Sequence, residues 1–173
     1  CCFESNRVGG AGGAIFSIGQ LSLEQCSFVR NESRETSAYY PFPGGGALCV
    51  VSGTVSVVQC QFSTNSVLGA PGSSSVSGLG NYWQLGGGGD AVGGAVLLAD
   101  VEGQIDRSSF VGNYTIGGIY DGAARGGALA SIRSRVRIHE TRVEGNWVLG
   151  LQGGQSGEAP SGHSGGSATG GGA

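Results

Sequence analysis

The chain has 173 residues, a net charge of −3 and 37 glycines, with only four prolines and no collagen-like Gly-X-Y period. Its length suits one domain, and its mild negative charge gives no basis for binding nucleic acid or a bulk membrane surface. No run of eighteen apolar residues is present, so the sequence predicts no membrane-spanning helix. A glycine content this high is typical of disorder, but ordered apolar repeats argue against disorder for most of the chain.

A motif of Gly-Gly-Ala followed about twenty residues later by Asn occurs four times. The blocks begin at glycines 12, 45, 93 and 126, and a half copy that ends at Asn6 opens the chain. A further copy is suggested by Gly165-Gly166-Ser167. The spacing from Gly to Asn is the same in every block to within one residue, whereas the gap to the next block varies several-fold. A constant block with a variable insert predicts a solenoid, in which the blocks lie in register and the inserts leave as loops from one edge.

Each block contains apolar residues spaced as in short strands. Residues 14–18 and 47–51 follow a Gly pair, which permits a tight corner, and they are apolar on both faces. Apolar residues then alternate at Leu21 and Leu23 and at Val55 and Val57, which indicates strand rather than helix. The fold class predicted is therefore all-β, a parallel β-helix of about five coils spaced roughly 4.8 Å apart.

Two columns of equivalent residues are expected to run through these coils. One is an interior column of large apolar side chains, at Phe3, Phe28, Phe62, Phe110 and Val143. The other is a structural ladder of amide hydrogen bonds at the turns, formed by Asn6, Asn31, Asn65, Asn113 and Asn146. Asn31 and Asn113 also match the N-glycosylation pattern. The two roles compete, because an amide in the ladder is not available to a glycan.

The five cysteines give little indication of a disulfide framework or a metal site. Cys1, Cys26 and Cys60 occupy the same repeat position, which Ser108 and Thr141 fill in later copies, so internal stacking of thiols is favoured over disulfides. Pairing of Cys2 and Cys49 with other groups stays open. There is no Cys-x-x-Cys, and the two histidines are far from the thiols in sequence, so no metal and no cofactor is expected.

The third and fourth copies align with each other without a gap. This register predicts three complementary charge pairs, at Arg135 with Glu102, His139 with Asp106 and Glu140 with Arg107. The favoured interpretation is that these pairs only support the register. The alternative is a small basic stripe for an anionic glycan or phosphate, made of Arg133, Arg135, Arg137 and Arg142.

The inserts all leave at the same point of the repeat, between the Asn and the next Gly pair, and they carry aromatic residues. Exposed aromatic rings on a rigid edge are common binding anchors, so this loop edge is the candidate binding site for a glycan or protein ligand. The alternative is that the rings pack on one another and hold the loops in place. The candidate residues are Tyr39, Tyr40, Phe42, Tyr82, Trp83 and Tyr120.

Gly-Gly-Ala-Ile with a trailing Phe-x-x-Asn, repeated over residues 1–150, resembles the repeat of the polymorphic outer membrane protein family. Val143 in place of Phe and the longer Gly-rich inserts depart from the minimal repeat. The resemblance implies a right-handed β-helix, a pectin-lyase-like solenoid, displayed at a cell surface for adhesion or as a scaffold. It transfers no catalytic residues. Residues 151–173 are a Gly/Ser-rich segment that leads into a further partial coil, and both ends of the sequence suggest an internal piece of a longer protein.

Three functions follow from this interpretation. The first is a non-catalytic extracellular scaffold or adhesin segment, with contacts at the loop edge. The second is an architectural fibre or cell-wall component without a ligand, in which neighbouring coils or chains meet at the open ends. The third is a polysaccharide lyase or hydrolase, which is disfavoured because acidic residues are sparse on the strands and glycosidic chemistry needs paired carboxylates or a Ca²⁺-binding acidic cluster. The prediction is no enzyme and no catalytic residue.

Overall fold

The computed structural model describes residues 1–34, 44–70, 89–118, 122–151 and 168–169. Within these ranges the chain is all-β, it contains no helix, and every strand pair is parallel. The all-β class and the parallel pairing predicted from the sequence are thereby confirmed. The part of the chain so described has no helix with the length and apolar character needed to cross a membrane.

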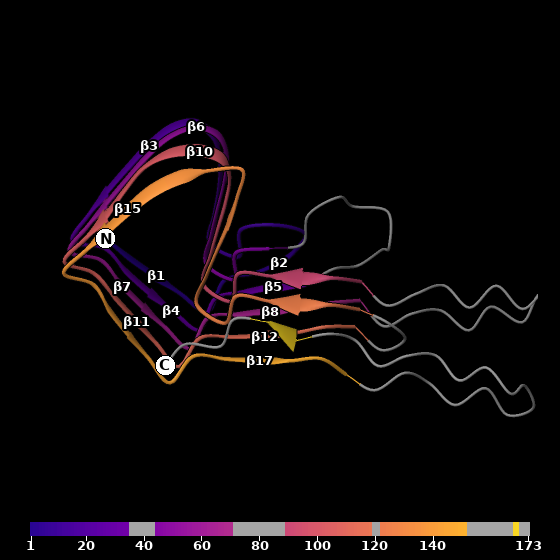
Figure 1. The fold of residues 1–173 in the computed structure, drawn as a ribbon. Coiled ribbons are helices and arrows are strands. Elements are labelled where there is room, and N and C mark those ends of the chain that lie inside the picture. Colours follow the sequence, from indigo (N-terminus) through magenta and orange to yellow (C-terminus); the bar gives the residue numbers. More distant parts are fainter. Residues whose placement is uncertain (35–43, 71–88, 119–121, 152–167, 170–173) are drawn as a thin grey trace, which may run out of the picture.

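Four parallel sheets contain the strands (Figure 1). The long-strand sheet, which is the arch at the top of Figure 1, contains β3 (Ile15–Glu24), β6 (Leu48–Val58), β10 (Val96–Asp106), β14 (Leu129–Ile132) and β15 (Arg135–His139). The Phe sheet contains β1 (Cys2–Glu4), β4 (Ser27–Val29), β7 (Gln61–Ser63), β11 (Ser109–Val111) and β16 (Arg142–Glu144). The third sheet contains β2 (Arg7–Gly9), β5 (Glu32–Arg34), β8 (Ser66–Leu68), β12 (Tyr114–Ile116) and β17 (Trp147–Leu149). A small sheet contains β9 (Ala91–Val92), β13 (Ala124–Arg125) and β18 (Ala168–Thr169).

Equivalent residues of successive repeats pair with one another in these sheets. Leu48 of β6 pairs with Ile15 of β3 on one side and with Val96 of β10 on the other, and Val96 also pairs with Leu129 of β14. The repeat that the sequence displays is therefore the repeat by which the strands pair. Each repeat places one strand in the Phe sheet and one in the third sheet, and one or two in the long-strand sheet. This arrangement is compatible with a parallel β-helix.

The Gly pair of each block is required by the close approach of neighbouring repeats. Its first member has a positive φ, which ranges from 65° to 70° at Gly12, Gly45, Gly93 and Gly126. Glycine adopts that conformation most readily, and a Cβ on any of these four glycines would also lie within 2.5 Å of the carbonyl oxygen three residues later. The second member has no such φ, but a Cβ on Gly13 or on Gly94 would collide with the carbonyl oxygen of the equivalent glycine, Gly46 or Gly127, in the next repeat. One glycine serves the turn and the other leaves room for the neighbouring backbone.

The core lies between the long-strand sheet and the Phe sheet, and the phenylalanine column runs through it. Phe3, Phe28, Phe62 and Phe110 lie ring on ring, with centroids 4.7–4.8 Å apart and planes within 6° of parallel. Phe28 and Phe62 have no exposed surface. Val143 pairs with Phe110 in the same register but is 42% exposed, because it lies in the last repeat of the column that the structure describes.

The ten non-glycine residues with positive φ in the described chain fall into three columns. One column precedes the Asn ladder (Ser5, Arg30, Thr64), one follows the long strands (Gln25, Gln59, Arg107, Glu140), and one lies at the bend within them (Ser52, Asp100, Arg133). The left-handed conformation thus lies at the residue before Asn, and the Asn side chain points inward to its partners in the ladder.

The asparagines are joined by side-chain hydrogen bonds from one repeat to the next. The Nδ2 of Asn31 donates to the Oδ1 of Asn65 at 2.9 Å, and the Nδ2 of Asn65 donates to the Oδ1 of Asn113 at 2.9 Å. The same bond joins Asn6 to Asn31 at 2.8 Å and Asn113 to Asn146 at 2.9 Å. Each Oδ1 acceptor also receives a backbone N–H from the repeat before it. Buried amides therefore have partners for both their donor and their acceptor atoms, as buried polar groups require.

The cysteines of the repeat column are free thiols. Cys26 and Cys60 are buried, and each sulfur donates to the backbone carbonyl two residues earlier at 3.3 Å. The Ser108 hydroxyl makes the equivalent bond, to the Asp106 carbonyl, at 2.9 Å. A thiol and a hydroxyl thus fill the same position with the same hydrogen bond. Cys49 is also buried, in β6, whereas Cys1 and Cys2 are exposed.

Candidate functional site: a polar groove on the long-strand sheet and its charged rim

The outward face of the long-strand sheet carries two rows of polar side chains. Strand alternation places Leu21 and Val55 inward, against the core, so their neighbours on either side face outward. Because the four strands pair in register, these neighbours align across the sheet. The first row is Gln20, Thr54, Glu102 and Arg135, and the second is Ser22, Ser56, Gln104 and Arg137.

A groove of about 790 Å³ runs between the two rows. The backbone of Leu21, Val55, Gly103 and Val136 lies between the rows and is the floor of the groove. The groove therefore crosses β3, β6, β10 and β15 and follows the direction in which the repeats succeed one another. We refer to it as the polar groove.

Charged residues gather where the polar groove meets the last repeat. Arg135 lies 3.8 Å from Glu102, at the outer limit of an ion pair, and both side chains are largely exposed. Arg137 is opposite Gln104 and has no ion pair among the described residues. One carboxylate and two guanidinium groups leave this end of the groove with a net positive charge.

Beside the groove, Asp100 and Arg133 form a two-pronged ion pair. The Nε and the second terminal nitrogen of Arg133 donate to the two carboxylate oxygens of Asp100 at 2.7 and 2.6 Å. The hydrogen bond from Arg133 holds the pKa of Asp100 below its usual value. The sequence interpretation missed this pair, although Asp100 and Arg133 are equivalent positions in the same gapless alignment that predicted the others. Arg133 is committed to Asp100 and does not extend the positive end of the groove.

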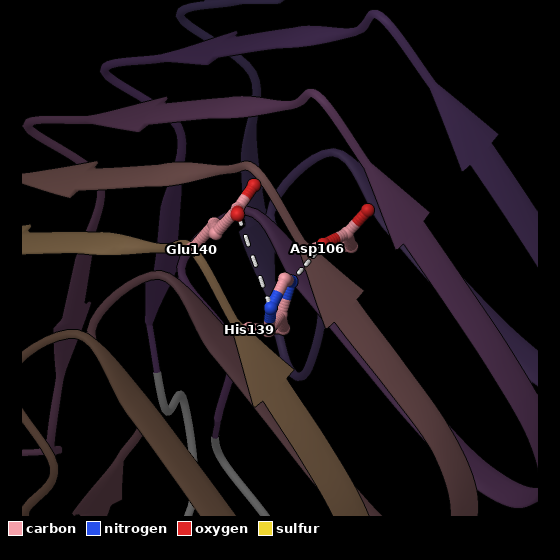
Figure 2. Close-up of side chains that lie close together, drawn as sticks. All are labelled: Asp106, His139 and Glu140. Atoms are coloured by element: carbon pink, nitrogen blue, oxygen red, sulfur yellow. Dashed lines mark hydrogen bonds and ion pairs between the residues drawn. The ribbon is translucent and has the colours of Figure 1, made fainter.

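The corner after the long strands holds a second cluster, formed by Asp106, His139 and Glu140 (Figure 2). His139 lies between the two carboxylates: its Nδ1 is 3.0 Å from Asp106, and its Nε2 is 3.9 Å from Glu140. Arg107 donates to the other oxygen of Asp106 at 2.8 Å. The hydrogen bond with His139, followed by that with Arg107, holds the pKa of Asp106 below its usual value.

Two of the three charge pairs expected from the alignment of the third and fourth copies are present. Arg135 approaches Glu102 and His139 approaches Asp106. The third was wrong: Arg107 turns back to Asp106, and Glu140 faces His139. Arg107 and Glu140 both have a positive φ at the corner, 47° and 45°. Their side chains therefore leave the sheet in directions that regular strand pairing does not predict.

The corner cluster is better suited to ion pairing than to metal binding or acid catalysis. One ligand atom from each of the three residues lies within 4.8 Å of the others, but the two ring nitrogens of His139 face different carboxylates. A metal ion would need one nitrogen and both carboxylates directed at the same point. A carboxyl that acts as a general acid needs a raised pKa, and that of Asp106 is lowered. The contact of His139 with Asp106 joins β15 to β10.

The six aromatic residues of the predicted loop-edge site, from Tyr39 to Tyr120, lie outside the described residues. The inserts that contain them begin after strands of the third sheet. On that sheet Tyr114 and Trp147 lie ring on ring, with centroids 4.6 Å apart, and Trp147 is 43% exposed. An aromatic pair thus exists on the sheet from which the inserts depart.

The folded structure argues against glycosylation at Asn31 and Asn113. Both side chains have no exposed surface. The Nδ2 of Asn31 donates to the Asn65 side chain and to the Phe3 carbonyl, and that of Asn113 donates to the Asn146 side chain and to the Phe62 carbonyl. A glycan on either nitrogen would replace a ladder bond and would have to pass through the core.

Comparisons with protein-family models, with curated proteins and with solved structures find no match to this chain.

Proposed function

We propose that the chain is a segment of a right-handed parallel β-helix of the polymorphic outer membrane protein type, used as a non-catalytic scaffold or adhesin at a cell surface. The observation that carries the proposal is the in-register pairing of four repeats through a buried Asn ladder and a Phe column. Such pairing makes a rigid rod whose length depends on the number of repeats. A rod that displays variable inserts from one edge is suited to contact rather than to chemistry.

The properties of the described carboxylates support a non-catalytic role. The acidic side chains on the long strands and at their ends are Glu24, Asp100, Glu102, Asp106 and Glu140. Asp100, Glu102 and Asp106 each face an Arg or His partner, and the pKa is lowered at Asp100 and Asp106. Lowered values keep these groups ionised and unsuited to protonate a leaving group.

Surface display is tested on intact cells that produce the parent protein. Antibodies raised against the purified chain should label intact cells, and external protease should remove the label without lysis. Label that appears only after permeabilisation would contradict the proposal. A purely architectural role makes the same prediction for location, but it differs in expecting no ligand on either the loop edge or the polar groove.

A further inference from the structure

The polar groove has the shape and the hydrogen-bonding groups of a site for an extended polymer. It crosses four parallel strands, so its length is at least three strand spacings, or about 14 Å. Its walls repeat at every strand, which gives a donor or acceptor on both sides at each step. Within the described residues, no side-chain hydrogen bond is made by Gln20, Ser22, Thr54, Ser56 or Gln104.

The charge at one end of the groove selects an acidic polymer. Arg137 has no acidic partner in the described chain. The guanidinium group of Arg135 lies 3.8 Å from the carboxylate of Glu102, which is the outer limit of an ion pair. The two arginines are two residues apart on β15, so their side chains leave the same face of the strand. Arginine binds carboxylates through two parallel N–H donors. A carboxylate seated between Arg135 and Arg137 would thus replace water at two exposed guanidinium groups.

The same geometry disfavours a peptide or a nucleic acid. Peptides are recognised at a free strand edge, in an apolar groove, in an aromatic-lined groove or, where they are acidic, by a cluster of arginines. The backbone of β6 and β10 under this groove is paired on both sides, so among the described residues only its two outer strands, β3 and β15, have a free edge. The residues that line the groove include no aromatic ring, and an acidic peptide on the two arginines is tested below with polyglutamate. Nucleic acid binding requires many phosphate contacts, whereas this groove offers two arginines and the chain has a net charge of −3.

We propose that the polar groove binds a linear acidic polysaccharide that lies along the direction of the repeats, with its hydroxyls on the Gln, Ser and Thr rows and a carboxylate between Arg135 and Arg137. The inference rests on the proposed surface function and names its ligand class. It places the contact on the long-strand sheet, in addition to the loop edge.

The test uses isothermal titration calorimetry on the full chain with a tetrasaccharide of galacturonic acid, the neutral galactose tetrasaccharide and a short polyglutamate peptide. The acidic tetrasaccharide should bind, the neutral one should bind at least tenfold more weakly, and added salt should reduce the difference. Arg137→Gln should weaken acidic binding about tenfold. The matched control Arg142→Gln, which removes an arginine paired with Glu144 on β16, should not change it.

A second variant fills the groove without changing charge. Ser22→Trp places a ring between the rows and should abolish binding, whereas Gln61→Trp, at an exposed position of the Phe sheet, should not. Melting temperatures equal to that of the unmodified chain would show that both variants fold. The inference is overturned if the acidic tetrasaccharide does not bind, if Arg137→Gln and Ser22→Trp leave binding unchanged, or if polyglutamate binds as tightly. The cell-surface labelling experiment is separate from the calorimetry. Absence of binding in the groove can therefore be distinguished from absence of the protein at the cell surface.

Discussion

Asn65 illustrates how much the fold depends on single buried amides. Its Oδ1 accepts both the Asn31 Nδ2 and the Asn31 backbone N–H at 2.9 Å, and its Nδ2 donates to Asn113 and to the Phe28 carbonyl. The side chain has no exposed surface. Removing it takes away the partner of the Asn31 backbone N–H and of the Phe28 carbonyl in these bonds. It also leaves the Asn31 Nδ2 and the Asn113 Oδ1 with one hydrogen bond each in place of two. Each unsatisfied buried group costs about 1–3 kcal/mol.

We therefore expect Asn65→Ala to lower the free energy of unfolding by at least about 3 kcal/mol. Gln61→Ala, at an exposed position in the neighbouring strand, should change it by less than about 0.5 kcal/mol. Urea denaturation of both variants measures the difference. Equal stabilities would contradict the role of the ladder.

Thiol reactivity at single cysteines tests the burial of the core. Burial raises the pKa of Cys49 to about 12, and it also raises that of Cys60. Because the thiolate is the reactive form, Cys49 should resist a maleimide or a disulfide reagent at neutral pH. Cys1 and Cys2 are exposed and should react at once. Mass spectrometry after brief labelling should find adducts at Cys1 and Cys2 in the native chain and at Cys49 only after unfolding. Rapid native labelling of Cys49 would contradict its burial.

We expect two carboxylates to make the stability of the fold depend on pH. The pKa of Asp100 and that of Asp106 are lowered in the folded chain by their Arg and His partners. Their ionised forms thus stabilise the fold fully above the unfolded value of 3.8, and this contribution is lost as the pH falls through the lower folded values. The melting temperature should drop below about pH 4, and the drop should be smaller in an Asp100→Asn, Asp106→Asn double variant.

The control for this titration is Glu24→Gln, because Glu24 has no ion pair among the described residues. It should leave the acid-dependent drop as in the unmodified chain. The melting temperature of the double variant and that of the unmodified chain are compared between pH 5 and pH 2. If both decrease by the same amount, the ion pairs of Asp100 and Asp106 do not contribute to stability.

At the scale of the elements, the Gly pair limits how closely two repeats approach. Gly94→Ala places a methyl group against the Gly127 carbonyl of the next repeat. The backbone of β10 must then move away from its neighbours, and we expect a loss of about 3 kcal/mol or more, similar to overpacking of a core.

Gly112→Ala is the matched control. Gly112 has a φ of 63°, but a Cβ there would meet only the Thr64 Cγ2, at an ordinary contact distance of 3.7 Å. Arg30 and Thr64 adopt the same conformation at the equivalent positions. The cost should be about 1 kcal/mol. Thermal unfolding of both variants gives the comparison. A Gly94 variant as stable as the Gly112 variant would show that the repeats are not in close contact at the Gly pair.

The strands and their register could be predicted from the sequence because the repeat carries two independent signals. Apolar alternation identifies each strand, and the equal spacing of Gly and Asn identifies which residue faces which. Pairing such as Phe28 with Phe62, or Glu102 with Arg135, follows directly. The corners could not be predicted in the same way. Their side-chain directions depend on positive φ values at residues such as Arg107 and Glu140, for which the residue type gives no indication.

The polar groove was not predicted for a similar reason. Its walls are made of small and medium polar residues, Gln, Ser and Thr, which individually indicate only a solvated strand face. Only pairing of four strands brings Ser22, Ser56 and Gln104 into one row beside Gln20 and Thr54. The signal was present as two polar positions that flank the same inward residue in every repeat. The basic stripe considered from the sequence included Arg133 and Arg142, and the structure pairs these with Asp100 and Glu144.

At the scale of the whole molecule, stability should accumulate from contacts between neighbouring repeats. The phenylalanine column contributes on the order of 2 kcal/mol per buried ring from the area removed from water. The ring of Phe62 lies between two others, whereas Phe3 has one ring neighbour among the described residues. The inner repeats are therefore the most firmly held, and inserts between them can vary without loss of the column.

The most direct test of this account is the pattern of nuclear Overhauser effects in the isotopically labelled chain. In-register pairing predicts contacts from the Phe62 ring to the rings of both Phe28 and Phe110, and from the Asn65 side-chain amide to the amides of Asn31 and Asn113. These residues are far apart in sequence, so no local structure could produce the contacts. Contacts shifted by one residue, or contacts from Phe62 to one neighbour only, would contradict the parallel β-helix on which the proposed function depends.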